Sequence, residues 1–146
     1  MNPQNIYAPP AYGSLPSNPG KLSVDIPYDY IYDVVLTGNQ ALRDQIVAIQ
    51  NDADFVLRSI KLASYTGAFQ IRLSDSQGTY LSNGYLNYGV FLSGGVAVEF
   101  PMFPELTFPA GGRIGIDITD TSGATNTIEI AFRGAKRYRV PAEIAR

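Results

Sequence analysis

Apolar and polar side chains alternate with a period of two along much of the chain after residue 28, which is the pattern of β-strands with one buried face. The alternation is clearest at 69–73, 114–118 and 128–132. In these segments a large apolar residue occupies every second position, and each one contributes about 1.5 to 3 kcal/mol when it is fully buried. The three segments therefore predict the strands that anchor the core.

Clusters of turn-forming residues separate the alternating segments at the spacing of an all-β domain. They lie at 37–39, 51–54, 75–78, 82–84, 93–95, 109–112 and 120–123. Between them we predict weaker strands at 30–36, 41–50, 55–65, 79–82, 88–92 and 96–100, with an edge piece at 106–108. The segment 41–50 also has apolar residues at helical spacing, but it is short and bracketed by turns, which favours a strand.

The seven turns imply about eight strands, and an all-β chain of 146 residues hides its sheet edges in a barrel or a two-sheet sandwich. Long and uneven connections favour the sandwich. We therefore predict an all-β, jelly-roll-like two-sheet sandwich with an extended N-terminal arm rich in Pro and Tyr. The predicted arm covers 1–27, the sandwich 28–140 and a short C-terminal tail 141–146.

The leader MNPQNIYAPPAYGSLPSNPG has five prolines, two tyrosines and no charged side chain. A free, solvated segment is usually kept soluble by charge, and a core segment shows apolar periodicity, whereas this leader has neither. Its prolines favour an extended backbone that loses less entropy on binding. We predict that the leader docks on a neighbouring protein subunit through Tyr7, Pro9, Pro10 and Tyr12.

Two further features point to a protein partner. Tyrosines are concentrated in the first 32 residues, where Tyr28 and Tyr30 either contact a partner or, together with Tyr32, line the inner face of a first strand. Charge is polarised, because aspartates gather in the first third of the chain and a basic run follows the last strong strand. That run, Arg133, Lys136, Arg137 and Arg139, is either a solvated, edge-protecting face or a contact with an acidic partner surface or the acidic front of another subunit.

Composition limits the chemistry that the chain can perform. It has no cysteine and no histidine, which excludes thiolate sites and the commonest general base and metal ligand. Aspartates at 52–54 and 117–120 lack the density of a calcium loop, so we expect turn capping and no metal or cofactor. A net charge of -2 gives no basic field for nucleic acid. There is no apolar run long enough to span a membrane and no signal-peptide pattern, which predicts synthesis in the cytoplasm.

The phrases DFVLRSI at 54–60, FQIRLSDSQG at 69–78 and FPAGGRI at 108–114, together with the uncharged leader, resemble the small jelly-roll cement, or decoration, proteins of tailed bacteriophage heads. The likeness covers about residues 30–135. It implies a non-enzymatic homo-oligomer, with a dimer favoured over a trimer. It also implies binding to the major capsid protein on the outside of the virion capsid, with stabilisation of the contacts between capsid subunits.

Two alternatives come from other classes of protein. A carbohydrate-binding β-sandwich module would use Tyr80, Tyr85 and Tyr88 around the Asn83–Gly84 turn, although the chain has no tryptophan to offer the strongest stacking surface. A carboxylate-dependent hydrolase is the third interpretation, and it rests only on the chance that some pair among the thirteen acidic residues is suitably spaced.

Overall fold

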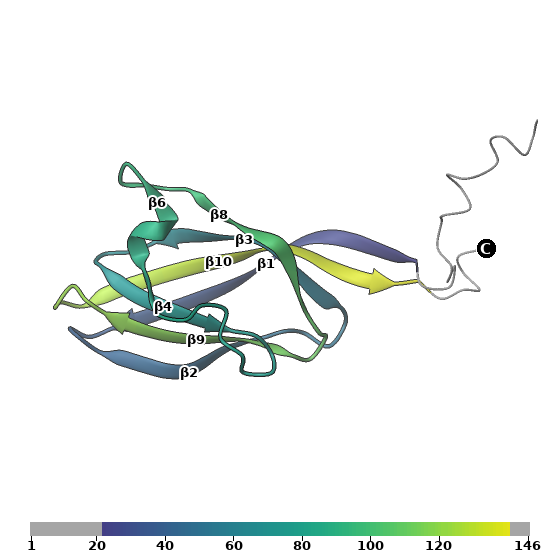
Figure 1. The fold of residues 1–146 in the computed structure, drawn as a ribbon, viewed down its shortest axis with the longest axis horizontal. Helices are drawn as coiled ribbons and strands as arrows, with labels where there is room; N and C mark the ends of the chain where they lie inside the picture. The colour runs from purple at the N-terminus through teal and green to yellow at the C-terminus, as the bar shows by residue number, and fades with distance from the viewer. Residues whose placement is uncertain (1–21, 141–146) are drawn as a thin grey trace, which may run out of the picture. The chain divides into compact units, whose positions relative to one another are not determined.

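The computed structural model describes residues 22–140, and these form a protein made almost entirely of β-strands (Figure 1). The strands are β1 (Ser23–Leu36), β2 (Ala41–Ala48), β3 (Asp54–Ser64), β4 (Phe69–Ser74), β5 (Leu86–Asn87), β6 (Leu92–Ser93), β7 (Val96–Ala97), β8 (Glu99–Phe108), β9 (Arg113–Asp120) and β10 (Asn126–Arg139). A short 3-10 helix, η2, spans Tyr88–Phe91. The described residues contain no helix with the length and hydropathy needed to cross a membrane.

The described chain falls into two compact units. The smaller unit contains the outer ends of β1 and β10, namely residues 22–24 and 138–140, where the backbone N–H of Val140 donates to the carbonyl of Leu22 at 2.8 Å. The larger unit, Asp25–Arg137, contains the two main sheets. The candidate sites described below lie in this larger unit.

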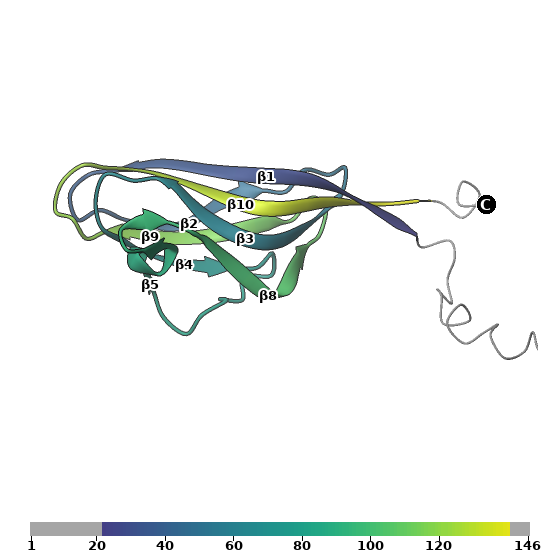
Figure 2. The same cartoon turned by 90° about the horizontal axis from the view of Figure 1, so that it is seen from above.

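The larger unit is a sandwich of two four-stranded sheets, which are seen as two layers in Figure 2. Sheet A has the strand order β1-β10-β3-β8, and sheet B has the order β2-β9-β4-β5. The pairs β1 with β10, β2 with β9, β3 with β8 and β4 with β5 are nested one inside the next along the sequence. A long hairpin folded over on itself in this way is a jelly roll, so the predicted fold class is confirmed.

The core lies between the two sheets and is built by the alternation that predicted it. All nine apolar residues of the three strongest segments are buried: Phe69, Ile71 and Leu73 on β4, Ile114, Ile116 and Ile118 on β9, and Ile128, Ile130 and Phe132 on β10. β9 lies between β2 and β4, and β10 lies between β1 and β3. Central strands therefore carry the most completely buried apolar residues.

Several predicted boundaries differ from the structure. β1 begins at Ser23, so the last residues of the predicted arm belong to a strand. Residues 79–82 form no strand and make only an isolated bridge between Ser74 and Tyr80. Much of 88–92 is the helix η2, and the predicted edge piece at 106–108 is the end of the longer strand β8. These errors fall where strands are short or irregular and the period-two pattern is weak.

Segment 41–48 is a strand, as predicted, and it contains an irregularity. The register of β2 against β9 shifts between Leu42 and Gln45, and Asp44 within this bulge has a φ of 56°. Aspartate is one of the few residues with a side chain that adopts this left-handed conformation readily. A bulge of this kind turns a side chain away from the direction that the strand alone would give it.

Candidate interaction surface on sheet A

β1 is an edge strand of sheet A with two different faces. Its burial alternates along the strand, so that Tyr30, Tyr32 and Leu36 point into the core while Asp29, Ile31, Asp33 and Val35 are exposed. Ile31 is 47% exposed and Val35 is 60% exposed. The outer face of β1 therefore alternates acidic and apolar side chains.

The tyrosines of β1 belong to the inner face. Tyr30 is buried, its ring lies 4.8 Å from that of Phe55, and its hydroxyl accepts a hydrogen bond from the backbone N–H of Gln50 at 3.0 Å. Burial raises the pKa of Tyr32 to about 12. Tyr28 is half-buried and packs edge-on against Tyr30 at 4.9 Å. Tyr30 is therefore a core residue and is not accessible to a partner, and Tyr28 lies mainly against the core.

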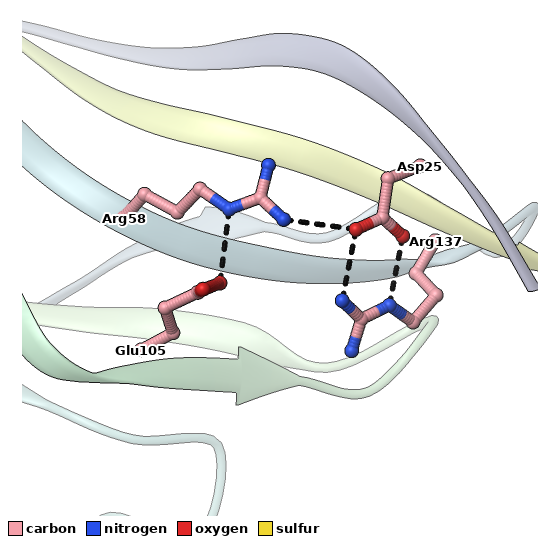
Figure 3. Close-up of polar contacts among 4 residues, drawn as sticks. All are labelled: Asp25, Arg58, Glu105 and Arg137. Carbon is pink, nitrogen blue, oxygen red and sulfur yellow. Dashed lines mark hydrogen bonds and ion pairs between the residues drawn. The ribbon is translucent and has the colours of Figure 1, made fainter. Parts of the chain in front are cut away.

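Two arginines of the basic run meet the aspartates of β1, because β1 and β10 are neighbours in sheet A. Arg137 binds both oxygens of Asp25 at 2.8 Å, and Arg58 of β3 donates to Asp25 at 2.9 Å (Figure 3). Arg58 also donates to Glu105 of β8 at 2.9 Å. Hydrogen bonding from Arg137, followed by that from Arg58, lowers the pKa of Asp25 from 3.8 to about 2. This row of charges crosses all four strands of the sheet.

A second row runs parallel to the first. Arg133 of β10 donates to Asp29 of β1 at 3.2 Å and also to Glu99 of β8. Ser59 of β3 donates to the same glutamate at 3.1 Å. We call these two sets of contacts the paired rows. They show that Arg133 and Arg137 are paired with acidic residues of their own chain.

The remaining basic residues of the run lie elsewhere. Lys136 is 5% exposed, and its ammonium group contacts Asp52 at 3.0 Å and Gln50 while lying 4.2 Å from the centre of the Tyr28 ring. A lysine held in this way fastens β10 to the β2–β3 turn. Arg139 is exposed at the end of β10, in the smaller unit.

At the other end of the same face, the ion pairs formed within residues 22–140 include neither Asp33 nor Glu129. Hydrogen bonding with Asp33 of β1, followed by charge repulsion from it, raises the pKa of Glu129 on β10. Both residues line a shallow hollow of about 350 Å³, together with Val35 and Thr127. We call Ile31, Asp33, Val35 and Glu129 the acidic–apolar patch. It combines exposed apolar surface with two carboxylates that repel each other.

The two edges of sheet A differ in their protection. β8 contains Pro101 and Pro104, which have no N–H, and its register with β3 is interrupted between Leu57 and Ser59. These are common means of preventing unwanted strand pairing. Between the prolines Phe103 is 88% exposed. β1 has one proline, Pro27, and within the described residues no strand pairs with its outer edge.

Other predicted site residues are distributed as follows. Tyr7, Pro9, Pro10 and Tyr12 lie outside the described residues. Of the tyrosines considered for carbohydrate binding, Tyr80 and Tyr85 are exposed, whereas Tyr88 packs against Phe69. Asp120 caps a turn, as expected, by accepting from the backbone of Gly123 at 3.0 Å.

The acidic–apolar patch was not found from the sequence. Its signal was present in the alternation of Asp with Ile and Val along 29–35, but the pattern does not reveal that Glu129 lies beside Asp33. Among the described residues no three His, Cys, Asp or Glu side chains converge as a metal site would require. Comparison of the chain with protein-family models and with curated proteins finds no match.

Proposed function

We propose that this protein is a structural virion protein of the cement, or decoration, type, which binds the outside of a phage head and stabilises contacts between major capsid protein subunits. In this proposal it is a homo-oligomer, with a dimer favoured, and acts by binding rather than by catalysis. It is made in the host cytoplasm and ends on the capsid exterior. The sequence resemblance and the jelly-roll sandwich support this class.

The observation that carries the proposal is the exposed edge strand β1 with its acidic–apolar patch. A long strand edge offers unpaired backbone groups to a second strand. On β1 this edge adjoins Ile31 and Val35, whose burial against a partner would remove apolar surface from water. Neither side chain belongs to the core of the folded domain.

The patch also defines the charge of the partner surface. A lysine or arginine placed between Asp33 and Glu129 would relieve their repulsion and gain charge-assisted hydrogen bonds. The paired rows offer little to such a partner because their carboxylates are already bound to Arg58, Arg133 and Arg137. We therefore expect basic residues on the shell surface, or on a second copy, opposite the patch.

The leader is continuous with this edge strand. Residues 21 and 22 separate it from Ser23, the first residue of β1, so a leader bound to a shell subunit would tether β1 to the same shell. Two adjacent attachments raise the effective concentration of each other. The proposed clamp therefore consists of the leader and β1 acting together.

The test is decoration of empty heads assembled from the major capsid protein encoded in the same genome. The full-length Val35→Ser variant should bind these heads more weakly, and Val96→Ser is the matched control because Val96 is equally apolar, 66% exposed and on β7, outside sheet A. Tyr7→Ala and Tyr12→Ala should each weaken binding by about 1 to 3 kcal/mol if they are buried anchors. Bound and free protein are separated by co-sedimentation.

The heads should also disassemble at a higher temperature when decorated, because a ligand that binds only the assembled shell stabilises it. Absence of binding to these heads would refute the proposed function. Binding that is unchanged in both Val35→Ser and the leader variants would show that another surface is the clamp. Sedimentation of the free protein tests the expected dimer.

A further inference from the structure

A second hollow, of about 270 Å³, lies on the outer face of sheet B. Its walls come from three elements that are distant in sequence: the bulge of β2, the strand β9 and the loop that follows β4. The lining is mainly polar and includes Asp44, Ser74, Tyr80, Arg113 and Gly115. The site is separate from the acidic–apolar patch, which is on sheet A.

The carboxylate of Asp117 holds two walls of this hollow together. Asp117 is only 6% exposed, and it accepts from the backbone N–H of Asp44 and from the hydroxyl of Tyr80, both at 2.8 Å. It therefore fixes the left-handed bulge of β2 and the position of the tyrosine. Asp117 is a positioning residue, because both of its oxygens are already used by the protein.

The groups left for a ligand are of three kinds. The Asp44 side chain is exposed on the bulge, and among the described residues it makes no hydrogen bond or ion pair. Arg113 contributes an exposed guanidinium group. Tyr80 is 43% exposed as a residue, and the guanidinium of Arg72 lies 3.7 Å from the centre of its ring, which holds the ring in place.

The floor is kept open by Gly115. A Cβ atom at this position would lie 2.0 Å from the Oγ of Ser74, so any side chain would push the serine hydroxyl aside and fill the hollow. A neighbouring hollow of about 410 Å³ shares Ile46 and Arg113 with the first. Because they adjoin, the two hollows together offer more room than either one alone.

We propose that this hollow binds a neutral saccharide. A carboxylate accepts hydrogen bonds from two adjacent hydroxyl groups, and a guanidinium donates to hydroxyl or ring oxygens. Arg72 covers one face of the Tyr80 ring, so the C–H groups of a sugar would stack on the other face. Asp44 and Asp117 offset the positive charge of Arg113 in the lining, so the hollow is better suited to a neutral ligand than to an anion. Two adjoining hollows suit a disaccharide better than a monosaccharide.

The experiment is a titration of full-length, ¹⁵N-labelled protein followed by the backbone amides of Asp44, Ser74 and Gly115. The ligands are glucose, galactose, mannose, N-acetylglucosamine and disaccharides of each, because the particular sugar is not specified by the lining. We expect saturable shifts at these amides with at least one sugar, with a Kd of about 1 mM or tighter, and tighter binding of its disaccharide.

Two variants locate the binding. Asp44→Gly should weaken it about tenfold or more while the protein stays folded, because glycine readily adopts a positive φ. Tyr80→Ala should weaken it to a similar extent, whereas Tyr85→Ala should not. Tyr85 is the matched control because it is also an exposed tyrosine with an arginine, Arg43, over its ring, yet it does not line the hollow.

No saturable shift with any of these sugars would overturn the proposal. Shifts at the same amides with calcium chloride and none with sugar would also overturn it, because they would identify a cation site. Equal losses in Tyr80→Ala and Tyr85→Ala would place the sugar elsewhere. Since the assay contains no phage heads, its result is independent of whether the protein decorates a capsid.

Discussion

The paired rows and the acidic–apolar patch lie on the same face of sheet A, yet they handle charge in opposite ways. In the paired rows, Asp25 and Asp29 of β1 lie opposite arginines of β10, so charge that is polarised along the sequence is neutralised within one chain. In the patch, Asp33 faces Glu129 and their charges repel. The difference shows that acidic and basic residues clustered in separate parts of a sequence do not by themselves indicate a protein partner. It must first be known which strands are neighbours in the sheet.

The strongest test of this contrast is the removal of the carboxylate shared by two arginines. Asp25→Ala removes three charge-assisted hydrogen bonds. Arg137 loses both of its bonds to this carboxylate, and Arg58 keeps only its ion pair with Glu105. We expect the free energy of unfolding to fall by about 1 to 2 kcal/mol, between the values typical of exposed ion pairs and of hydrogen bonds to charged groups. Denaturant unfolding of the purified protein measures the change.

Asp29→Ala is the matched comparison, since Asp29 receives one contact from Arg133 at 3.2 Å and is more exposed. Its loss should cost less than about 1 kcal/mol. Equal losses in Asp25→Ala and Asp29→Ala would mean that the shared, bidentate geometry adds nothing to stability.

A smaller effect is expected in the pH dependence of stability. The pKa of Asp25 is lowered from 3.8 to about 2 in the folded protein, so its contribution is complete above about pH 4 and is lost as the pH falls towards 2. Thermal melts across this range should show a shallower loss of stability in Asp25→Asn than in the unmodified chain. Parallel curves for the two proteins would contradict the assigned role of Asp25.

Glu129, in the acidic–apolar patch, should change stability with pH in the opposite direction to Asp25. The pKa of Glu129 is raised, so its contribution to stability is present below the ordinary glutamate pKa and is lost as the pH rises through the folded value. As the pH rises, Asp25 should therefore increase the free energy of unfolding and Glu129 should decrease it.

The smallest expected effect is a gain of stability. Glu129→Gln removes the like charge beside Asp33 and should raise the free energy of unfolding slightly at neutral pH. Glu105→Gln, in a paired row, should lower it, because Arg58 loses a charged acceptor. If Glu129→Gln destabilises the protein at neutral pH, the two carboxylates are not in conflict.

The alternation of apolar residues was enough to predict the sandwich, because a buried strand face imposes a period of two on the sequence. All nine apolar residues that it placed in the core of β4, β9 and β10 are buried, although Asp117 and Ala131 on the opposite face are buried as well. It failed at 79–82 and 88–92, where the chain between β4 and β8 makes brief strands and a 3-10 turn. Short elements bury too few side chains to leave a periodic pattern.

Surface sites were harder to predict than the core. The basic run of β10 was visible in the sequence, but its partners depend on which strand lies beside β10. The hollow on sheet B requires contact between Asp44 and Asp117, which are 73 residues apart in the sequence. It also requires the bulge of β2, which the residue types of this strand do not predict. The residue type therefore suggested Tyr80 as a binding residue, but the sequence did not show which residues lie beside it in the folded protein.

The nesting of the strand pairs has a consequence for the synthesis of the chain. β1 leaves the ribosome before its partner β10, and the strands β2 to β9 are synthesised between them. At about 5 to 20 residues per second, β1 waits for some seconds with no strand beside it. During that time Ile31 and Val35 are open to pairing with other nascent chains. The apolar surface of β1 is interrupted at every fourth residue by an aspartate, namely Asp25, Asp29 and Asp33. In the nascent chain these charges would act as gatekeepers against aggregation. Only after β10 is in place do they serve as ion-pair partners or as part of a binding surface.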